Sequence, residues 1–130
     1  MSFLLDTHTW IWSLTDPGQL SPEAVEIIEG GRRELALSPI SIWETLMLHE
    51  NGRIDLGPDP QRGIAWLLGE YPLREMPLTS AIALRSRLID LPHQDPADRF
   101  LAATSIVHDM PIITRDQHLV ASPHVSTIVA

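Results

Sequence analysis

Four acidic residues, far apart in the sequence, stand where carboxylates can do chemistry. Asp6 directly follows a short apolar run, and Asp116 follows a second such run after a single residue. Glu44 falls on a helical face that is otherwise apolar, and Asp98 falls in the first turn of a predicted helix. Carboxylates brought together by a fold are the ligands that Mg²⁺ and Mn²⁺ prefer. The four acids are therefore candidates for a metal site.

Each acid also has an ordinary structural explanation. Asp6 and Asp116 occupy positions that favour caps and turns, and Asp95 is a natural N-cap, with Asp98 at the third helical position. Capping and the helix dipole stabilise such acids by roughly 0.5–2 kcal/mol without any function. Glu44 either lies at the edge of its apolar face and reaches water, or is desolvated and needs a positive partner.

The elements predicted around these acids are short apolar strands that alternate with helices. This alternation is typical of an α/β fold with a central parallel sheet flanked by helices on both faces. Strands are expected over residues 2–5, 34–37, 73–76, 111–114 and 125–129, and helices over 7–14, 22–30, 39–50, 61–70, 79–88 and 95–107, with a turn or short helix from 116. The carboxyl ends of parallel strands share one rim, so Asp6 and Asp116 should meet there. Residues 1–130 are expected to form one domain.

A cluster of Asp6, Glu44, Asp98 and Asp116, with Asp95 close by, would repel itself and raise its own pKa values. A hard divalent cation is the simplest remedy, and its charge would act on a substrate as well. One or two such ions can activate water and stabilise the leaving 3′ oxygen of a phosphodiester. The sequence therefore favours Mg²⁺- or Mn²⁺-dependent hydrolysis of nucleic acid.

The composition narrows the alternatives. The 130 residues carry 17 acidic and 9 basic side chains, for a net charge of −8, and every basic residue is arginine. The absence of lysine excludes P-loop phosphate transfer, Schiff-base chemistry and Ser–Lys hydrolysis. The absence of cysteine excludes thiol nucleophiles and zinc–thiolate sites and suits a cytoplasmic protein. No apolar run reaches the ~18–20 residues needed to span a bilayer, and no signal peptide is predicted, so we expect no membrane association.

Three segments resemble the PIN domain, and more narrowly the VapC-type toxins of toxin–antitoxin systems. They are LLDTHTWIW at the start, SPISIWETLMLHENGRI in the middle, and HQDPADRFLAATSIVHDMPIITRD near the end. The resemblance covers nearly the whole chain, and its last motif is specific. It implies a Rossmann-like sheet and a Mg²⁺- or Mn²⁺-dependent ribonuclease. It assigns the catalytic and metal-binding acids to Asp6, Glu44, Asp98 and Asp116, with Asp95 as a possible further ligand or a cap.

The same resemblance implies partners and supporting residues. It implies an RNA substrate, a homodimer and a cognate antitoxin whose tail blocks the site, and an acidic protein would attract a basic tail. Thr7 and Thr114 would help to position water or an acid. One departure is Ala97, which stands where the family usually has an aromatic residue and which puts local packing in doubt.

Other polar and aromatic residues receive more ordinary interpretations. Arg99 and Arg115 each adjoin an acid and could contact phosphate, although Arg99 is better explained as a structural ion-pair partner. His8 and His93 show no zinc-ligand spacing and are interpreted as polar or packing residues. The tryptophans are predicted to be core residues rather than base-stacking platforms; they are Trp10, Trp12, Trp43 and Trp66.

Two other functions are compatible with parts of the sequence. A phosphatase of the HAD type with Asp6 as nucleophile needs a second Asp where this chain has His8, and a lysine that it lacks, so it is rejected. A catalytically silent PIN-fold module that only binds another protein is the alternative that sequence leaves open. Saturable binding of a divalent metal, lost on Asp6→Asn, would separate that module from the enzyme.

Overall fold

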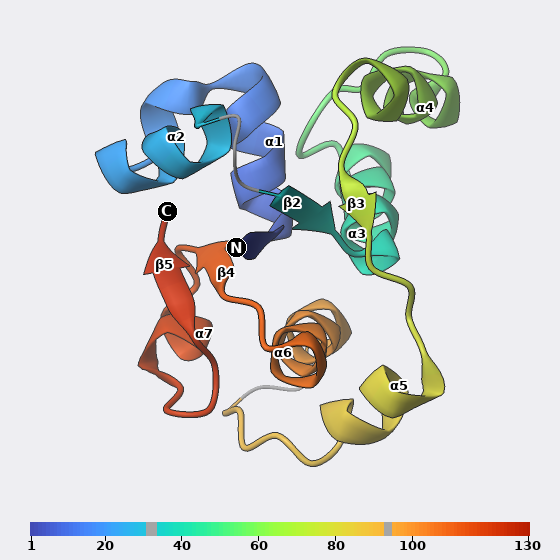
Figure 1. Cartoon of the computed structure of the whole chain (residues 1–130). Helices are drawn as coiled ribbons and strands as arrows, with labels where there is room; N and C mark the ends of the chain where they lie inside the picture. Colours follow the sequence, from blue (N-terminus) through green and yellow to red (C-terminus); the bar gives the residue numbers. More distant parts are fainter. Residues whose placement is uncertain (31–33, 93–94) are drawn as a thin grey trace.

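The computed structural model describes residues 1–30, 34–92 and 95–130 (Figure 1). Its centre is a five-stranded sheet in the order β3-β2-β1-β4-β5, in which every neighbouring pair is parallel. The strands are β1 (Ser2–Leu5), β2 (Glu34–Leu37), β3 (Arg74–Glu75), β4 (Ile112–Thr114) and β5 (Thr127–Val129). The predicted α/β fold with a central parallel sheet is confirmed.

Helices join the strands and begin at the caps that the sequence predicts. Ser21 and Ser38 each accept a hydrogen bond from a backbone N–H of the first turn and are followed by proline, and Thr79 caps its helix in the same way. The helical elements are α1 (Thr7–Thr15), the 3₁₀ helix η1 (Pro17–Gln19), α2 (Pro22–Glu29), α3 (Pro39–Glu50), α4 (Pro60–Glu70), α5 (Ser80–Ser86), α6 (Pro96–His108) and α7 (Gln117–Ala121).

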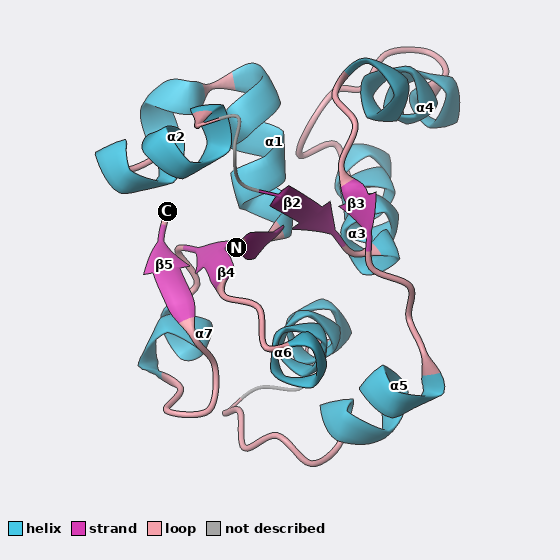
Figure 2. Cartoon of the chain, viewed as in Figure 1, coloured by secondary structure: helices cyan, strands magenta, loops and turns pink. Residues whose placement is uncertain are grey.

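Helices lie on both faces of the sheet (Figure 2). Because alternate strand residues point to opposite faces, the strands contribute to two separate buried clusters. On one side Leu4 and Ile112 belong to a cluster with residues of α5, α6 and α7. On the other, Phe3 and Leu5 belong to a cluster with residues of α1, α2 and α4. Helix α3 contacts α1 and α6, so it touches both layers. No helix in the described ranges has the length and apolarity to cross a bilayer.

Several helix and strand boundaries differ from those expected. Strand β3 has only two residues, and β5 begins two residues later than expected. Helix α5 ends at Ser86 rather than near residue 88. The core assignment of the tryptophans holds for Trp10, which is 3% exposed, but is wrong for Trp43 and Trp66, which are 50% and 61% exposed. Both lie on helices whose buried residues are few, so their apolar character is not evidence of burial.

Candidate active site

Two of the acids lie at the ends of neighbouring strands, as the topology predicts. Asp6 follows β1, and its backbone N–H donates to the carbonyl of Ile113 in β4 at 3.1 Å. Thr114 ends β4 and donates its hydroxyl to Oδ2 of Asp6 at 2.7 Å, while the same hydroxyl oxygen accepts from the backbone N–H of Asp116 at 3.0 Å. The hydroxyl of Thr114 therefore links both acids at the carboxyl edge of the sheet.

Helix α3 supplies the third acid. Its residues Ser41 and Thr45 are buried, and Glu44, on the turn between them, is half-buried. The hydroxyl of Thr7 at the start of α1 lies 3.0 Å from that of Ser41 and is also hydrogen-bonded to the Glu44 carboxylate. This contact between α1 and α3 places Glu44 beside Asp6.

The start of α6 supplies the last two acids, Asp95 and Asp98. Asp95 is its N-cap, with Oδ1 accepting from the backbone N–H of Ala97 at 2.9 Å, and Asp98 is half-buried in the first turn. Ala97 itself is 1% exposed, so the position where the family usually has an aromatic residue is packed.

His93 lies outside the described residues. Asp6 and Asp116 also cap helices, so the structural role predicted for them does not exclude a place in the acidic cluster.

The acids face a common cavity of about 370 Å³. Its described lining consists of Asp6, His8, Trp12, Glu44, Asp95, Asp98, Arg115 and Asp116. All five carboxylates that sequence singled out therefore meet in one place, although they come from four separate stretches of the chain.

The electrostatics of the cavity are unfavourable to ionised acids. Burial raises the pKa of Asp6 above its usual range, opposed by the hydrogen bonds from Thr114 and Thr7. Burial likewise raises the pKa of Glu44, and the charge of Asp6 adds to that effect. For Asp98, burial together with the charges of the four other carboxylates raises the pKa from an ordinary 3.8 to about 8. The cluster thus carries negative charge that its surroundings do not balance.

The donor set is all oxygen, which is what a hard divalent cation prefers and what zinc in a thiolate site does not. Among the described residues, no three Asp, Glu or His side chains already form a finished set of metal ligands. The cavity therefore offers the chemistry of a Mg²⁺ or Mn²⁺ site, in which water would complete the coordination.

Comparison with known proteins agrees with this geometry. Residues 3–123 match the family model of the PIN domain. The chain belongs to the PIN domain family. It is 35% identical over 126 residues to "Ribonuclease VapC22" of Mycobacterium tuberculosis, an alignment that covers 93% of this chain and 92% of that protein.

Solved structures with the same fold include two of toxin–antitoxin type. DNA-bound VapBC from Salmonella typhimurium aligns with a TM-score of 0.73 at 18% identity, covering 98% of this PIN domain and 97% of that chain. A toxin–antitoxin complex from Klebsiella pneumoniae aligns with a TM-score of 0.63 at 20% identity, covering 98% and 96%. At these identities the likeness establishes the fold alone.

Arg99 of this PIN domain does not pair with the acid beside it. Its side chain is 7% exposed, and Nη1 donates to the carbonyls of Ser86 at 2.9 Å and Ile89 at 3.0 Å. Nη2 donates to the carbonyl of Leu91 at 3.4 Å. The expected ion pair is therefore wrong: the guanidinium binds the last carbonyl of α5 and two carbonyls of the segment that follows it.

Trp12 is the site residue that sequence reasoning missed. It lines the acidic cavity, with its ring 5.6 Å from that of His8 and with the guanidinium carbon of Arg115 at 4.6 Å from the ring centroid. Its position in the sequence could have indicated this, because residues 8 and 12 lie one turn apart on the helix that Asp6 caps and therefore share a face near that acid.

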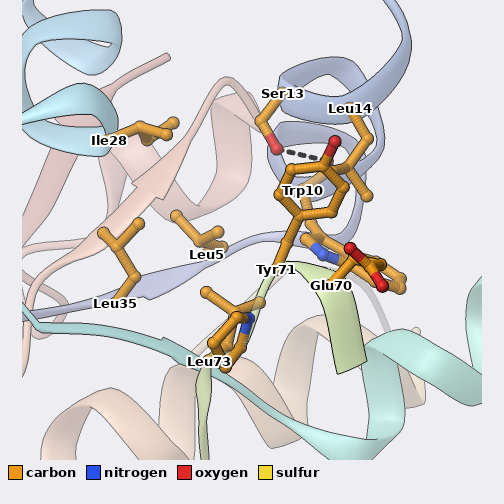
Figure 3. Close-up of a pocket in the computed structure, with 10 residues that line it drawn as sticks. Leu5, Trp10, Ser13, Leu14, Ile28, Leu35, Glu70, Tyr71 and Leu73 are labelled. Atoms are coloured by element: carbon orange, nitrogen blue, oxygen red, sulfur yellow. Dashed lines mark hydrogen bonds between the residues drawn. The ribbon is translucent and has the colours of Figure 1, made fainter. Parts of the chain in front are cut away.

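A second pocket, of about 390 Å³, lies between α1, α2 and the segment after α4 (Figure 3). Leu5, Ile28 and Leu35 face Trp10 and its neighbours across it (Figure 3). Glu70 is the single carboxylate among its described lining residues. This apolar pocket of the PIN domain therefore cannot supply the oxygen ligands that the acidic cavity provides.

Proposed function

We propose that this PIN domain is a metal-dependent ribonuclease that hydrolyses RNA phosphodiester bonds and is the toxin component of a toxin–antitoxin system. The observation that carries the proposal is the meeting of Asp6, Glu44, Asp98 and Asp116 in one cavity. The likeness of nearly the whole chain to a protein named as a VapC ribonuclease supports RNA as the substrate.

The same four acids are the proposed metal ligands, and the cofactor is Mg²⁺ or Mn²⁺. When bound, a divalent cation would lower the pKa of water and offset negative charge in the transition state. Mg²⁺ keeps several of its waters in proteins, so carboxylates need not all touch it. Asp95 is the additional candidate, since it faces the cavity while capping α6.

The chain's own residues act by orientation. Thr114 fixes the Oδ2 atom of Asp6, and the backbone N–H of Thr7 fixes Oδ1 at 2.6 Å, so this buried acid has little freedom to turn away from the cavity. Opposing the rise that burial causes, a hydrogen bond with the side chain of Thr7 lowers the pKa of Glu44 and so favours its ionised form. Preorganised acids lose little entropy when they engage a ligand, and no protein nucleophile is required.

The direct test is cleavage of total RNA by the purified chain with Mg²⁺, with Mn²⁺ or with EDTA, beside Asp98→Asn. We expect cleavage that needs metal and that falls about 100-fold or more in the variant, because metal charge contributes several kcal/mol of transition-state stabilisation. Asp90→Asn, which changes an exposed acid in the same way, is the matched control and should cleave normally.

Absence of cleavage with every metal by a folded chain would contradict the enzyme and favour the silent binding module. Calorimetry then decides between that module and an enzyme of very narrow substrate range. Saturable metal binding that is lost on Asp6→Asn would retain the enzyme, and no binding would reject it.

The proposal includes partners. We propose an antitoxin protein as the physiological inhibitor, supported by the shared fold with chains of toxin–antitoxin complexes. We also propose that residues 1–130 act as one domain in the cytoplasm and assemble as a homodimer. Light scattering of the purified chain, alone and after co-expression with its antitoxin, would measure both assemblies.

A further inference from the structure

Arg115 is the one arginine among the described residues that line the acidic cavity. It lies between Thr114, which ends β4, and Asp116, which caps α7, and its side chain is exposed. It shares the cavity with five carboxylates, yet it forms no ion pair with any described residue. Its guanidinium is held at the rim of the cavity by other contacts.

Two contacts hold it. The guanidinium carbon lies 4.6 Å from the ring centroid of Trp12, a cation–π distance, and Nε donates to the carbonyl of Ala130 at 3.2 Å. Trp12 is supported in turn by His8 from the preceding turn of α1. Because Nε is engaged, the two Nη groups remain, and they make no hydrogen bond to a described residue.

Two parallel N–H groups on a planar cation match the oxygens of a phosphate, which they bind in a bidentate manner. Holding the guanidinium in place beforehand lowers the entropy lost on binding. An RNA strand that approaches a protein of net charge −8 also needs a cation at the entrance to the acids. The chain has no lysine that could take this part.

We propose that Arg115 binds a phosphate of the RNA strand at the rim of the acidic cavity, and that Trp12 is the positioning residue that holds its guanidinium there. This inference rests on the proposed ribonuclease function. It names a binding residue and its support, neither of which belongs to the metal site.

The first test is steady-state cleavage of a single-stranded RNA over a series of KCl concentrations at constant Mg²⁺. For Arg115→Met we expect kcat/KM to fall about 10- to 100-fold, mainly through KM, as for loss of a charge-assisted bidentate contact. The slope of log(kcat/KM) against log[KCl] should become shallower by about 0.7, the value for one phosphate contact on a single strand. Arg115→Lys should keep the slope and recover only part of KM.

Arg62→Met is the matched control, because it removes the same charge from an exposed position on α4 away from the cavity. It should leave KM and the salt slope unchanged. A purely structural role for Arg115 would lower the melting temperature without altering the salt slope, so both are measured for each variant.

Trp12 is tested through its coupling to Arg115. Trp12→Phe keeps an aromatic face and should raise KM less than Trp12→Leu. The Trp12→Leu change should have little further effect in an Arg115→Met background, since the residue it positions is already gone. Fully additive effects of the two changes would overturn the positioning role.

A binding measurement separates failure of this inference from failure of the proposed function. Fluorescence anisotropy with a labelled single-stranded RNA in the Asp98→Asn background should show weaker binding and a shallower salt slope after Arg115→Met. Cleavage by the wild type with unchanged KM and salt slope in Arg115→Met would overturn the inference alone. Absence of wild-type cleavage would count against the ribonuclease, while the anisotropy result would still decide whether Arg115 binds phosphate.

Discussion

The carboxylate of Asp98 lies among four others, and its pKa of about 8 means that the ionised form is unfavourable in the metal-free fold at neutral pH. The unfolded chain loses this proton near pH 4, whereas the folded chain keeps it until about pH 8. Stability from this group therefore falls as pH rises from about 4 to about 8 and is level above that.

Asp98→Asn removes the charge and keeps the shape of the side chain. We expect it to raise the free energy of unfolding in EDTA at pH 8.5 by roughly 1–2 kcal/mol, allowing for the solvent that reaches a half-exposed group. The gain should shrink at pH 5. Thermal melts at both pH values measure it, and an equal effect at pH 5 and pH 8.5 would contradict the argument. Asp90→Asn should change neither melt.

Residue types and order were enough to predict the acidic cluster, but not the roles of the cations beside it. Asp6 and Asp116 were predictable because strand ends of a parallel sheet share a rim. The partners of Arg99 were not, because they are backbone carbonyls that depend on how α5 meets α6. Trp12 packs against the core cluster of Trp10 as predicted, but it also lines the acidic cavity, which its apolar character does not indicate.

Helix α5 is held in part by a side chain from another helix. The last carbonyl of α5, that of Ser86, and the carbonyls of Ile89 and Leu91 after it accept hydrogen bonds from Arg99 of α6. Arg99→Met should leave buried carbonyls without donors and destabilise the protein by about 2–4 kcal/mol.

Urea unfolding measures this destabilisation, because Arg99→Met should unfold at a lower midpoint concentration of urea than the wild type. Arg99→Lys should recover only a small part of it, because an ammonium cannot span three carbonyls as a planar fork does. Arg85→Met, at an exposed position of α5, is the control and should leave the midpoint nearly unchanged. A normal midpoint in Arg99→Met would show that α5 is held by apolar packing alone.

Element boundaries were predicted best where local chemistry decides them. The starts of α2 and α3 follow from Ser-Pro caps, and β1 and β2 follow from apolar runs bounded by polar residues. The short strands β3 and β5 were overestimated, since β3 pairs with only two residues of β2 and β5 with the three residues of β4. That limit is set by tertiary pairing and is invisible in the local sequence.

At the scale of the whole molecule, a net charge of −8 and a cavity of five carboxylates both disfavour an RNA substrate until a cation is present. Metal binding should therefore act as a folding ligand as well as a cofactor. Any ligand that binds only the folded state stabilises it, by about 2.7 kcal/mol at 100 times its Kd. That amount would raise the melting temperature of a chain of this size by several degrees.

The size of this rise should depend on pH in a defined direction. Below about pH 8 a metal ion must displace the proton of Asp98, so Mg²⁺ should raise the melting temperature more at pH 8.5 than at pH 6. NaCl at matched ionic strength controls for screening of the net charge. The rise should disappear in Asp98→Asn and persist in Asp90→Asn. An equal rise in wild type and Asp98→Asn would place the ion elsewhere, because the free energy of binding would then not depend on the acid that the cavity surrounds.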